Sequence, residues 1–493
     1  MFDTCCQRRT PPPGLPLEGE GKVEAMSEPQ IVWLRRDLRM ADQPALHAAA
    51  QAGPVIPVYV LDDERAGDHA YGGASLVWLH HSLESLGKSL GRRRSQIVLR
   101  KGDAPQVLAA LAHETGASCI HAIRHYEPWW KEAEDELRDA LHDLGGEDRR
   151  LCLYDGNYLL PPGSVTTGSG DPYKIYTPFS KAMLEVMPPR DPLPEPETIH
   201  SPESWPESDD LGDWGLLPTK PDWAGGIRDF WDFGEAAAHE RLGWWTDEVA
   251  DYDEGRNLPS DDITSRLSPH LHWGEISPAQ VWHKLKDKRS DGWKTYAKEI
   301  IWRDYAQNVI DQFPDYPRES YRDYDERRLW RNPDAGHLIR EDLECWQKGR
   351  TGYPIVDAGM RQLWQTGWMH NRVRMICASF LVKHLLIDWR HGEQWYWDCL
   401  VDADYGNNCV NWQWISGTGV DSNMFSRIMA PLSQSEKFDA AGYIREYVPE
   451  LADLDDGEIH DPPDENRGDY PVKMIGHREA RERALEAYKA SKP

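Results

Sequence analysis

The sequence predicts an α/β domain built on a parallel five-stranded sheet, followed by a long linker and an all-α domain. Between residues 30 and 154, short apolar runs alternate with helical patterns, which is typical of parallel strands covered by helices. From about residue 228 onward, helical periods rich in Trp and Arg replace this alternation. A chain of 493 residues is long enough for more than one such domain.

The elements follow in order along the chain. Strands are predicted at 31–34, 55–61, 96–99, 118–123 and 151–154, and helices at 44–51, 74–90, 104–114 and 129–144. No GxGxxG follows the first strand, so the dinucleotide fingerprint is missing. Pro, Gly, Ser and Asp crowd the next stretch and exclude long helices, except in an ordered-looking island at 173–184. We expect a disordered tail (1–28), the α/β domain (29–155), the linker (156–227) and the helical domain (228–493).

Composition narrows the function classes. Acidic residues outnumber basic ones by 83 to 56, a net charge of -27, which argues against a nonspecific nucleic-acid coat but leaves room for a local basic groove. No apolar run is long enough to cross a bilayer and no signal peptide precedes the first strand, so we expect a cytoplasmic protein. The 8 Cys include no CxxC pair, and we interpret them as reduced thiols without a metal site.

The 23 Trp residues indicate that the protein binds flat aromatic ligands or transfers electrons, although most of these side chains must pack in the core and at interfaces. Glu299, Trp302 and Arg303 share one helix face, where a surface ion pair is the simpler alternative. Asn371 and Met375 share another face, which could line a pocket or belong to a core.

Two further segments carry chemistry. Residues 402–414 hold two acids, two amides and two Trp, too polar for a core and too aromatic for an ordinary surface. Trp412 and Trp414, two positions apart, must face different directions. The segment 264–268 offers hydroxyls, backbone N–H groups and an Arg, which suits a diphosphate, although a helix N-cap is the commoner use.

Six motifs, in order and spacing, resemble the DNA photolyase and cryptochrome family from residue 31 to 489. They are Ile31-Val-Trp-Leu-Arg-Arg-Asp-Leu-Arg39, Thr264-Ser-Arg-Leu-Ser268, Glu299-Ile-Ile-Trp-Arg303, Thr351-Gly-Tyr-Pro-Ile-Val-Asp357, Trp368-Met-His-Asn-Arg372 and Trp412-Gln-Trp414. The resemblance implies FAD inside the helical domain and a light-driven repair enzyme. The excited reduced flavin would pass an electron to a cyclobutane pyrimidine dimer, which splits and returns it.

The resemblance also implies roles for individual residues. Cofactor contacts would come from Tyr252, Thr264, Ser265, Arg266, Leu267, Ser268, Tyr296, Arg303, Arg374, Asp402, Asp404 and Asn408. The lesion pocket would be formed by Glu299, Trp302, Asn371, Met375 and Trp414. DNA backbone contacts would come from Arg256, Arg372 and Gln434. Electrons would reach the flavin through Trp412, Trp389 and Trp330, with Trp346 as the alternative to the last.

Within this family, the favoured prediction is a photolyase that repairs cyclobutane pyrimidine dimers. The (6-4) photolyases and animal cryptochromes carry His where this chain has Asn371 and Met375, and that His is the proton donor of their chemistry. Asn408 and the short C-terminal end favour repair over signalling, while a cryptochrome-type blue-light receptor is the alternative and a (6-4) photolyase a weaker one.

The expected partner is UV-damaged DNA, bound by a monomer along a local basic stripe. The resemblance also allows an antenna chromophore in the N-terminal domain, near residues 126–129 and 173–176. Methenyltetrahydrofolate is the first choice, and a deazaflavin, FMN or an empty pocket stay open.

Overall fold

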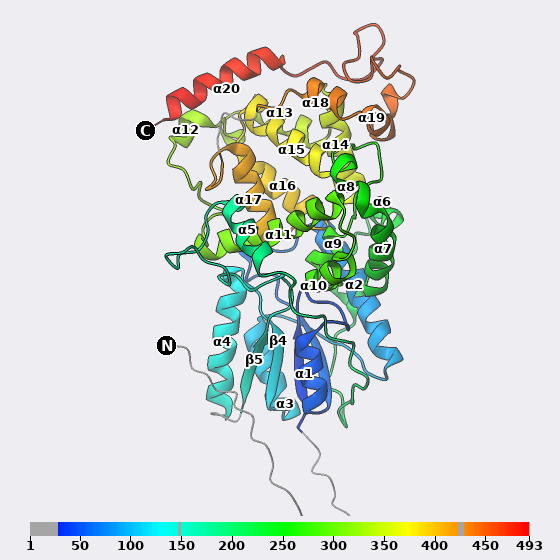
Figure 1. Cartoon of the computed structure of the whole chain (residues 1–493), viewed down its shortest axis with the longest axis vertical. Helices are drawn as coiled ribbons and strands as arrows, with labels where there is room; N and C mark the ends of the chain where they lie inside the picture. Colours follow the sequence, from blue (N-terminus) through cyan, green and yellow to red (C-terminus); the bar gives the residue numbers. More distant parts are fainter. Residues whose placement is uncertain (1–27, 146–148, 423–427, 493) are drawn as a thin grey trace, which may run out of the picture.

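The computed structural model describes residues 28–145, 149–422 and 428–492, so the predicted disordered tail lies, but for Glu28, outside the described residues. A layered α/β region forms one end of the molecule and a larger helical region the other (Figure 1). The predicted fold class, a parallel five-stranded sheet followed by a mostly helical C-terminal region, is confirmed.

The sheet has the strand order β3-β2-β1-β4-β5, and every neighbouring pair is parallel. The strands are β1 (Gln30–Leu34), β2 (Val55–Leu61), β3 (Val98–Lys101), β4 (Cys119–Ile123) and β5 (Arg150–Tyr154). The connecting helices are α1 (Pro44–Ala52), α2 (Gly73–Arg92), α3 (Ala104–Thr115) and α4 (Pro128–Gly145). Strand β3 lies two residues later than predicted, because its pairing with β2 begins at Val98.

Both faces of the sheet are covered, as strands without polar alternation require. Ile31 and Trp33 of β1 pack into a core with α3 and α4, whereas Val32 and Leu34 face α1 and α2. The carboxyl ends of the strands point toward the helical region (Figure 1).

The linker contains one longer helix, α5 (Tyr176–Glu185), close to the predicted island. The helical region then runs through α6 (Gly225–Phe230), α7 (Glu235–Glu248), α8 (Tyr252–Gly255), α9 (Ser268–His272), α10 (Pro278–Leu285), α11 (Asp291–Gln312), α12 (Glu326–Leu329), α13 (His337–Gln347), α14 (Pro354–Thr366), α15 (Asn371–Ser379), α16 (Trp389–Cys399), α17 (Tyr405–Ser416), α18 (Pro431–Lys437), α19 (Ala441–Tyr447) and α20 (His477–Ser491). The long helix α11 packs against α5, α8 and α17, so it is buried on several sides.

Two arginines, the buried Arg39 and the half-buried Arg303, tie the sheet, linker and helices together. The guanidinium of Arg39, in the first motif, donates to Asn157 Oδ1 at 3.1 Å, Gly156 O at 3.0 Å and Gly274 O at 2.9 Å. Arg303 of α11 donates to Asn157 O at 2.6 Å and Leu271 O at 2.9 Å. These bonds fix the carboxyl end of the sheet against the helices that carry the site.

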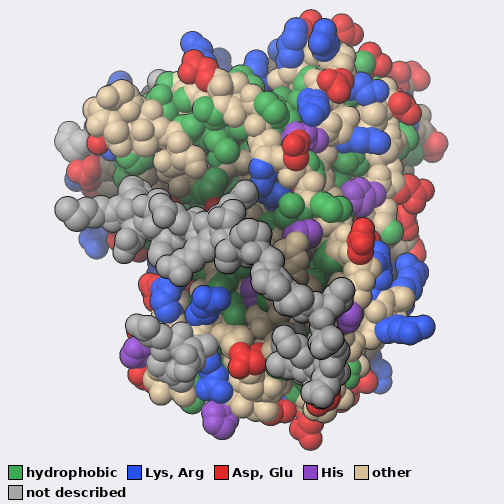
Figure 2. All heavy atoms as spheres, turned by 60° about the horizontal axis from the view of Figure 1, so that its bottom comes forward, with side chains coloured by type: hydrophobic (Ala, Val, Ile, Leu, Met, Phe, Trp, Pro, Cys, Tyr) green, Lys and Arg blue, Asp and Glu red, His purple; other side chains and the backbone are tan. Residues whose placement is uncertain are grey.

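The surface carries many charged side chains, as the sequence composition indicates (Figure 2). In Figure 2, acidic and basic side chains lie close together over much of the face shown, and several acidic groups follow its margin. Within the described parts of the chain, none of the helices has the length and apolarity needed to cross a membrane.

Candidate functional site

Most predicted site residues lie on four helices that pack on one another: α8 and α17 flank α11, and α15 lies against α17. Helix α11 carries Tyr296, Glu299, Trp302 and Arg303, α15 carries Asn371, Arg372, Arg374 and Met375, and α17 carries Asn408, Trp412 and Trp414. Segments separated by more than a hundred residues are thus brought to one place.

The predicted diphosphate turn, residues 264–268, is held by its neighbours. Arg241 donates to the carbonyls of Thr264 and Ser265, each at 2.8 Å, and Tyr296 donates its hydroxyl to Ser265 Oγ at 3.0 Å. Arg266 adopts a positive φ of 50°, which turns its side chain toward Asp262 at 3.0 Å. Its Nε is buried without a hydrogen-bond partner in the described structure. The turn therefore contains one N–H donor, that of Arg266 Nε, without an acceptor among the described residues.

The rest of this turn is built around aromatic packing. Leu267 is fully buried, and Ser268 begins the short helix α9. Tyr252 stands edge-on to Tyr296 with ring centroids 5.3 Å apart, so it closes the side of the turn facing α8.

Arg374 and Asp402, both named from the resemblance as cofactor contacts, form an ion pair. One guanidinium nitrogen lies 3.0 and 2.9 Å from the two carboxylate oxygens, and Nε donates to Met369 O at 2.7 Å. The side chain of Asp402 is 5% exposed and that of Arg374 is 23% exposed. Because both groups are largely removed from bulk water, the carboxylate and the guanidinium hold one orientation toward each other.

Asn408 is oriented by a residue that the sequence did not reveal. Its side-chain amide donates to Glu393 Oε1 at 2.8 Å and to Glu393 O at 3.1 Å. Since the NH₂ group is held by Glu393, the amide oxygen Oδ1 is the atom left to face the opposite direction. Glu393 lies on the buried face of α16, where an acid one turn after Trp389 is the signal that could have identified it.

Asp404 is buried at the start of α17 and caps it through Asn407 N at 2.8 Å. Burial alone raises the pKa of a carboxyl, but His272 at 3.8 Å and the guanidinium groups of Arg36 and Arg303 outweigh it and lower the pKa of Asp404. A fixed negative charge therefore lies between the sheet and the helices. Arg303 itself donates to Asn157 O in the linker and to Leu271 O in α9, and its charge acts on Asp404.

The predicted lesion residues are half-buried or exposed, whereas more than half of the predicted cofactor residues are buried. The indole of Trp302 stacks on Tyr176 of α5, with centroids 3.5 Å apart and planes 5° from parallel. Glu299, one turn earlier, pairs with Arg256 at 2.5 Å. Tyr176 was expected near an antenna site, so its contact with Trp302 is new information.

The other three lesion residues come from α15 and α17. Asn371 is exposed at the first turn of α15, and Met375 lies one turn later and is half-buried. Trp414 is half-buried whereas Trp412 is buried, as expected for positions that face different directions.

Four arginines converge on one buried histidine at the start of α15. Burial, reinforced by the charges of Arg372, Arg374, Arg256 and Arg266, lowers the pKa of His370 to about 3. Arg372 donates to the neutral Asn257 Oδ1 at 3.1 and 2.5 Å. Gln434 lies on α18, which packs against α14. The predicted rim residues Arg256 and Arg372 are thus neighbours in a cluster of basic side chains.

The predicted tryptophan route can be followed through helix contacts. A Cβ at Gly392 of α16 would lie only 2.2 Å from the ring of Trp412, so that ring packs on the α16 backbone one turn beyond Trp389. A bridge between Arg331 and Ile387 brings Trp330 to the start of the same helix. Trp346 is fully buried and lies edge-on to Trp412 at 6.4 Å.

A separate, small cavity of about 20 Å³, room for about one water molecule, lies where the carboxyl end of the sheet meets the helices. Its lining residues include Arg36, Asp62, Trp129, Trp130, His272 and Trp397. Arg36 follows β1 and Trp129 follows β4, the two strands at which the strand order reverses. In open parallel sheets this switch point is where ligands bind. The region around 126–129, named from sequence for a second chromophore, does therefore border a cavity.

Comparison with known proteins gives two family matches. The model for DNA photolyase matches residues 30–197, and the model for the FAD binding domain of DNA photolyase matches residues 296–490. Together they cover most of the chain.

Whole-chain relatives agree. The chain is 44% identical over 482 residues to a deoxyribodipyrimidine photo-lyase of Agrobacterium fabrum, covering 94% of this chain and 98% of that protein. It is 33% identical to cryptochrome-1 of Arabidopsis thaliana, covering 93% of this chain and 70% of that protein. The crystal structure of a bacterial class III photolyase from Agrobacterium tumefaciens superposes with a TM-score of 0.89 at 43% identity, covering 95% of this chain and 99% of that one.

Proposed function

The chain belongs to the DNA photolyase and cryptochrome family, and we propose that it is a deoxyribodipyrimidine photo-lyase that splits cyclobutane pyrimidine dimers in UV-damaged DNA. The observation that carries this proposal is the near-complete alignment with a photo-lyase at 44% identity. The similarity to a cryptochrome is weaker and leaves nearly a third of that protein unmatched. The site geometry adds a set of half-buried or exposed lesion residues beside a cofactor set that is mostly buried.

The residues present fit a flavin dinucleotide. Arg266 Nε and both ring nitrogens of His370 are buried without hydrogen-bond partners in the described structure, beside a turn of hydroxyls and backbone N–H groups. A diphosphate would accept from Arg266 Nε and from the single N–H of the neutral His370 ring, and guanidinium groups match phosphate geometry. When bound and reduced, FAD supplies the light-excited electron for dimer splitting.

The chain's own residues position that cofactor. The Arg374–Asp402 pair and Asn408 would border the isoalloxazine ring, and Glu393 turns the Asn408 carbonyl toward the ring. A carbonyl oxygen accepts a hydrogen bond, so it favours a flavin that carries a proton at N5, as the reduced form does. Asp404, ionised because of its cationic neighbours, keeps its place as a fixed anion.

The lesion would enter between α11, α15 and α17. Trp302, stiffened by Tyr176, and Trp414 offer flat apolar surfaces for the flipped pyrimidines, and Glu299 would hydrogen-bond their polar edges. Only one nitrogen of Arg256 holds Glu299, so the remaining donors of this guanidinium stay available for a DNA phosphate. A dimer is already poorly stacked, so its extrusion costs less than that of a normal pair.

The electron route would run from Trp412 through Trp389 to Trp330. Trp330 adjoins the start of the helix that carries Trp389, whereas the fully buried Trp346 touches Trp412 directly. This arrangement favours Trp330 over Trp346 as the outer end of the route.

A second chromophore would bind at the sheet switch point, where Trp129, Trp130 and Trp397 supply faces for a flat ring and Arg36 and Asp62 supply polar groups. The cavity there is about 20 Å³, so methenyltetrahydrofolate would enter only after these side chains move apart. Reconstitution with this folate should add an absorption band and increase the repair rate at that wavelength. A Trp129→Ala variant should lose both gains and keep flavin-driven repair.

The decisive test of the main proposal is illumination of the FAD-loaded, chemically reduced protein with a thymine-dimer oligonucleotide. We expect dimers to disappear in the light and to persist in the dark. Persistence in the light would favour the blue-light receptor, and repair of a matched oligonucleotide with a (6-4) photoproduct instead of the dimer would favour a (6-4) photolyase. Trp412→Phe should stop photoreduction and leave repair by pre-reduced enzyme intact. Glu299→Ala should lower repair and keep FAD bound.

A further inference from the structure

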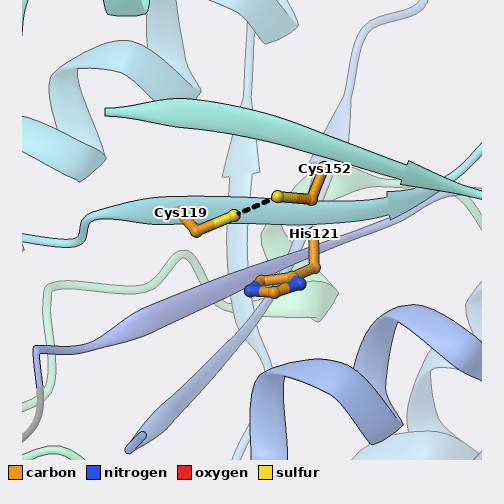
Figure 3. A group of neighbouring side chains, drawn as sticks. All are labelled: Cys119, His121 and Cys152. Carbon is orange, nitrogen blue, oxygen red and sulfur yellow. Dashed lines mark hydrogen bonds between the residues drawn. The ribbon is translucent and has the colours of Figure 1, made fainter. Parts of the chain in front are cut away.

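Two cysteine thiols meet inside the sheet, far along the strands from the cavity and the flavin residues. Cys119 is the first residue of β4, and Cys152 lies on the edge strand β5 (Figure 3). In the strand register Cys119 is opposite Arg150 and Cys152 is opposite His121, so the two thiols are diagonal neighbours on one face. Their sulfur atoms are 2.7 Å apart, with Cys119 as the donor.

A metal ion fits this cluster poorly, although His121 lies beside the thiols. Two thiolates bound to a tetrahedral zinc would be about 3.7 Å apart, from a Zn–S bond of about 2.3 Å. Both nitrogens of His121 already have partners, Tyr154 at 2.9 Å and Gln30 at 3.1 Å. A disulfide bond of about 2.0 Å requires a smaller movement of the two sulfurs.

We propose that Cys119 and Cys152 form a redox-active dithiol that is oxidised to a disulfide by small organic disulfides. Cys152, the more exposed thiol, attacks one sulfur of the reagent as a thiolate, forms a mixed disulfide and releases one thiolate. The buried Cys119 then loses its proton to that leaving thiolate or to water and attacks Cys152 Sγ. The mixed bond breaks and the second thiolate leaves. Two protein thiols are oxidised, and one disulfide is reduced to two thiols.

The surroundings give the two thiols these different roles. The hydrogen bond from Cys119, with help from Arg150, outweighs burial and lowers the pKa of Cys152 to about 7, so thiolate is present at neutral pH. His121 and Tyr154 also face the pair, and burial together with Arg150 lowers the pKa of His121 to about 4, so its ring stays neutral. Cys345 on α13 is also half-buried but has a pKa raised by burial, so it serves as the comparison thiol.

The test uses the full chain with FAD bound, treated with oxidised glutathione. The reaction is quenched with acid, and peptides are mapped by mass spectrometry without reduction. We expect a cross-linked peptide joining Cys119 and Cys152, a loss of both thiols, and unchanged dimer repair. Cys345→Ser should give the same cross-link. Cys119→Ser should stop at one glutathione on Cys152, and Cys152→Ser should leave Cys119 unmodified.

Three outcomes would overturn the proposal. They are recovery of Cys119 and Cys152 as free thiols, glutathione on Cys345 to the same extent as on Cys152, and stoichiometric zinc or copper in the purified protein that both cysteines are needed to hold. The peptide map of the wild-type protein tests the proposal on its own, without any variant. If a buried hydroxyl prevents Cys119→Ser from folding, Cys119→Ala takes its place.

Discussion

Removing the ring of Tyr176 should weaken binding of damaged DNA more than binding of undamaged DNA. This ring stacks on Trp302 at 3.5 Å and is itself held by a hydrogen bond from its hydroxyl to Lys298 O at 2.8 Å. An aromatic pair contributes about 0.5–1.5 kcal/mol beyond the area that it buries. Without Tyr176, the indole of Trp302 would gain conformational freedom, which it would lose again when the lesion binds. Tyr176→Ala should therefore raise the Kd for dimer-containing DNA by about 2- to 10-fold.

The assay is the Kd of a single-dimer duplex in the dark, compared with the same duplex without the dimer. Tyr176→Phe is the matched control, because it keeps the stack and loses only the bond to Lys298 O. It should bind the lesion within about a factor of two of wild type. If Tyr176→Ala binds damaged DNA like wild type, or loses affinity for both duplexes equally, the stack does not prepare the lesion pocket.

Three further predictions follow from charges in the helical region. Asp402→Asn leaves Arg374 without its anion and should destabilise the protein by about 2 kcal/mol in urea unfolding, whereas Asp342→Asn, in a more exposed pair, should stay below about 1 kcal/mol. Arg372→Gln should weaken damaged and undamaged DNA alike and reduce the slope of log Kd against log salt by about 0.9, one phosphate contact; an unchanged slope would remove Arg372 from the interface. Burial, reinforced by His477 and Arg483, lowers the pKa of His384 to about 3, below its value in the unfolded chain, so unfolded chains bind more protons and stability is lost as pH falls from about 6.5 toward 3. His384→Gln should flatten that loss by up to about 1.4 kcal/mol per pH unit, measured by urea unfolding across this range.

The sheet could be predicted because each of its strands is a local apolar run between turn signals. The exact position of β3 could not be predicted, because the apolar run at 96–99 does not show which residues pair with β2. Register is set by contacts between strands. The helix faces of Glu299 with Trp302 and of Asn371 with Met375 followed from spacing alone. The contacts of Tyr176 with Trp302 and of Glu393 with Asn408 join different elements, and one sequence holds no local signal for such pairs.

The sequence also could not show which groups the arginines of the family motifs contact. Arg39 and Arg303 both lie in recognised motifs, yet each donates to backbone carbonyls that join sheet, linker and helices. Motif membership therefore identifies the family and does not by itself separate a structural residue from one that touches a ligand.

The same region explains how a chain of net charge -27 can bind a polyanion. Around His370, carboxylates pair with Arg256, Arg266 and Arg374, and Arg372 donates to the amide oxygen of Asn257. Four guanidinium groups gather here, and acidic groups farther away than about 10 Å are largely screened at 0.1 M salt. Electrostatics alone would then give weak binding to any DNA. Preference for a dimer must come from the shape and stacking of the lesion pocket, so salt should weaken damaged and undamaged DNA in parallel while their ratio stays nearly constant.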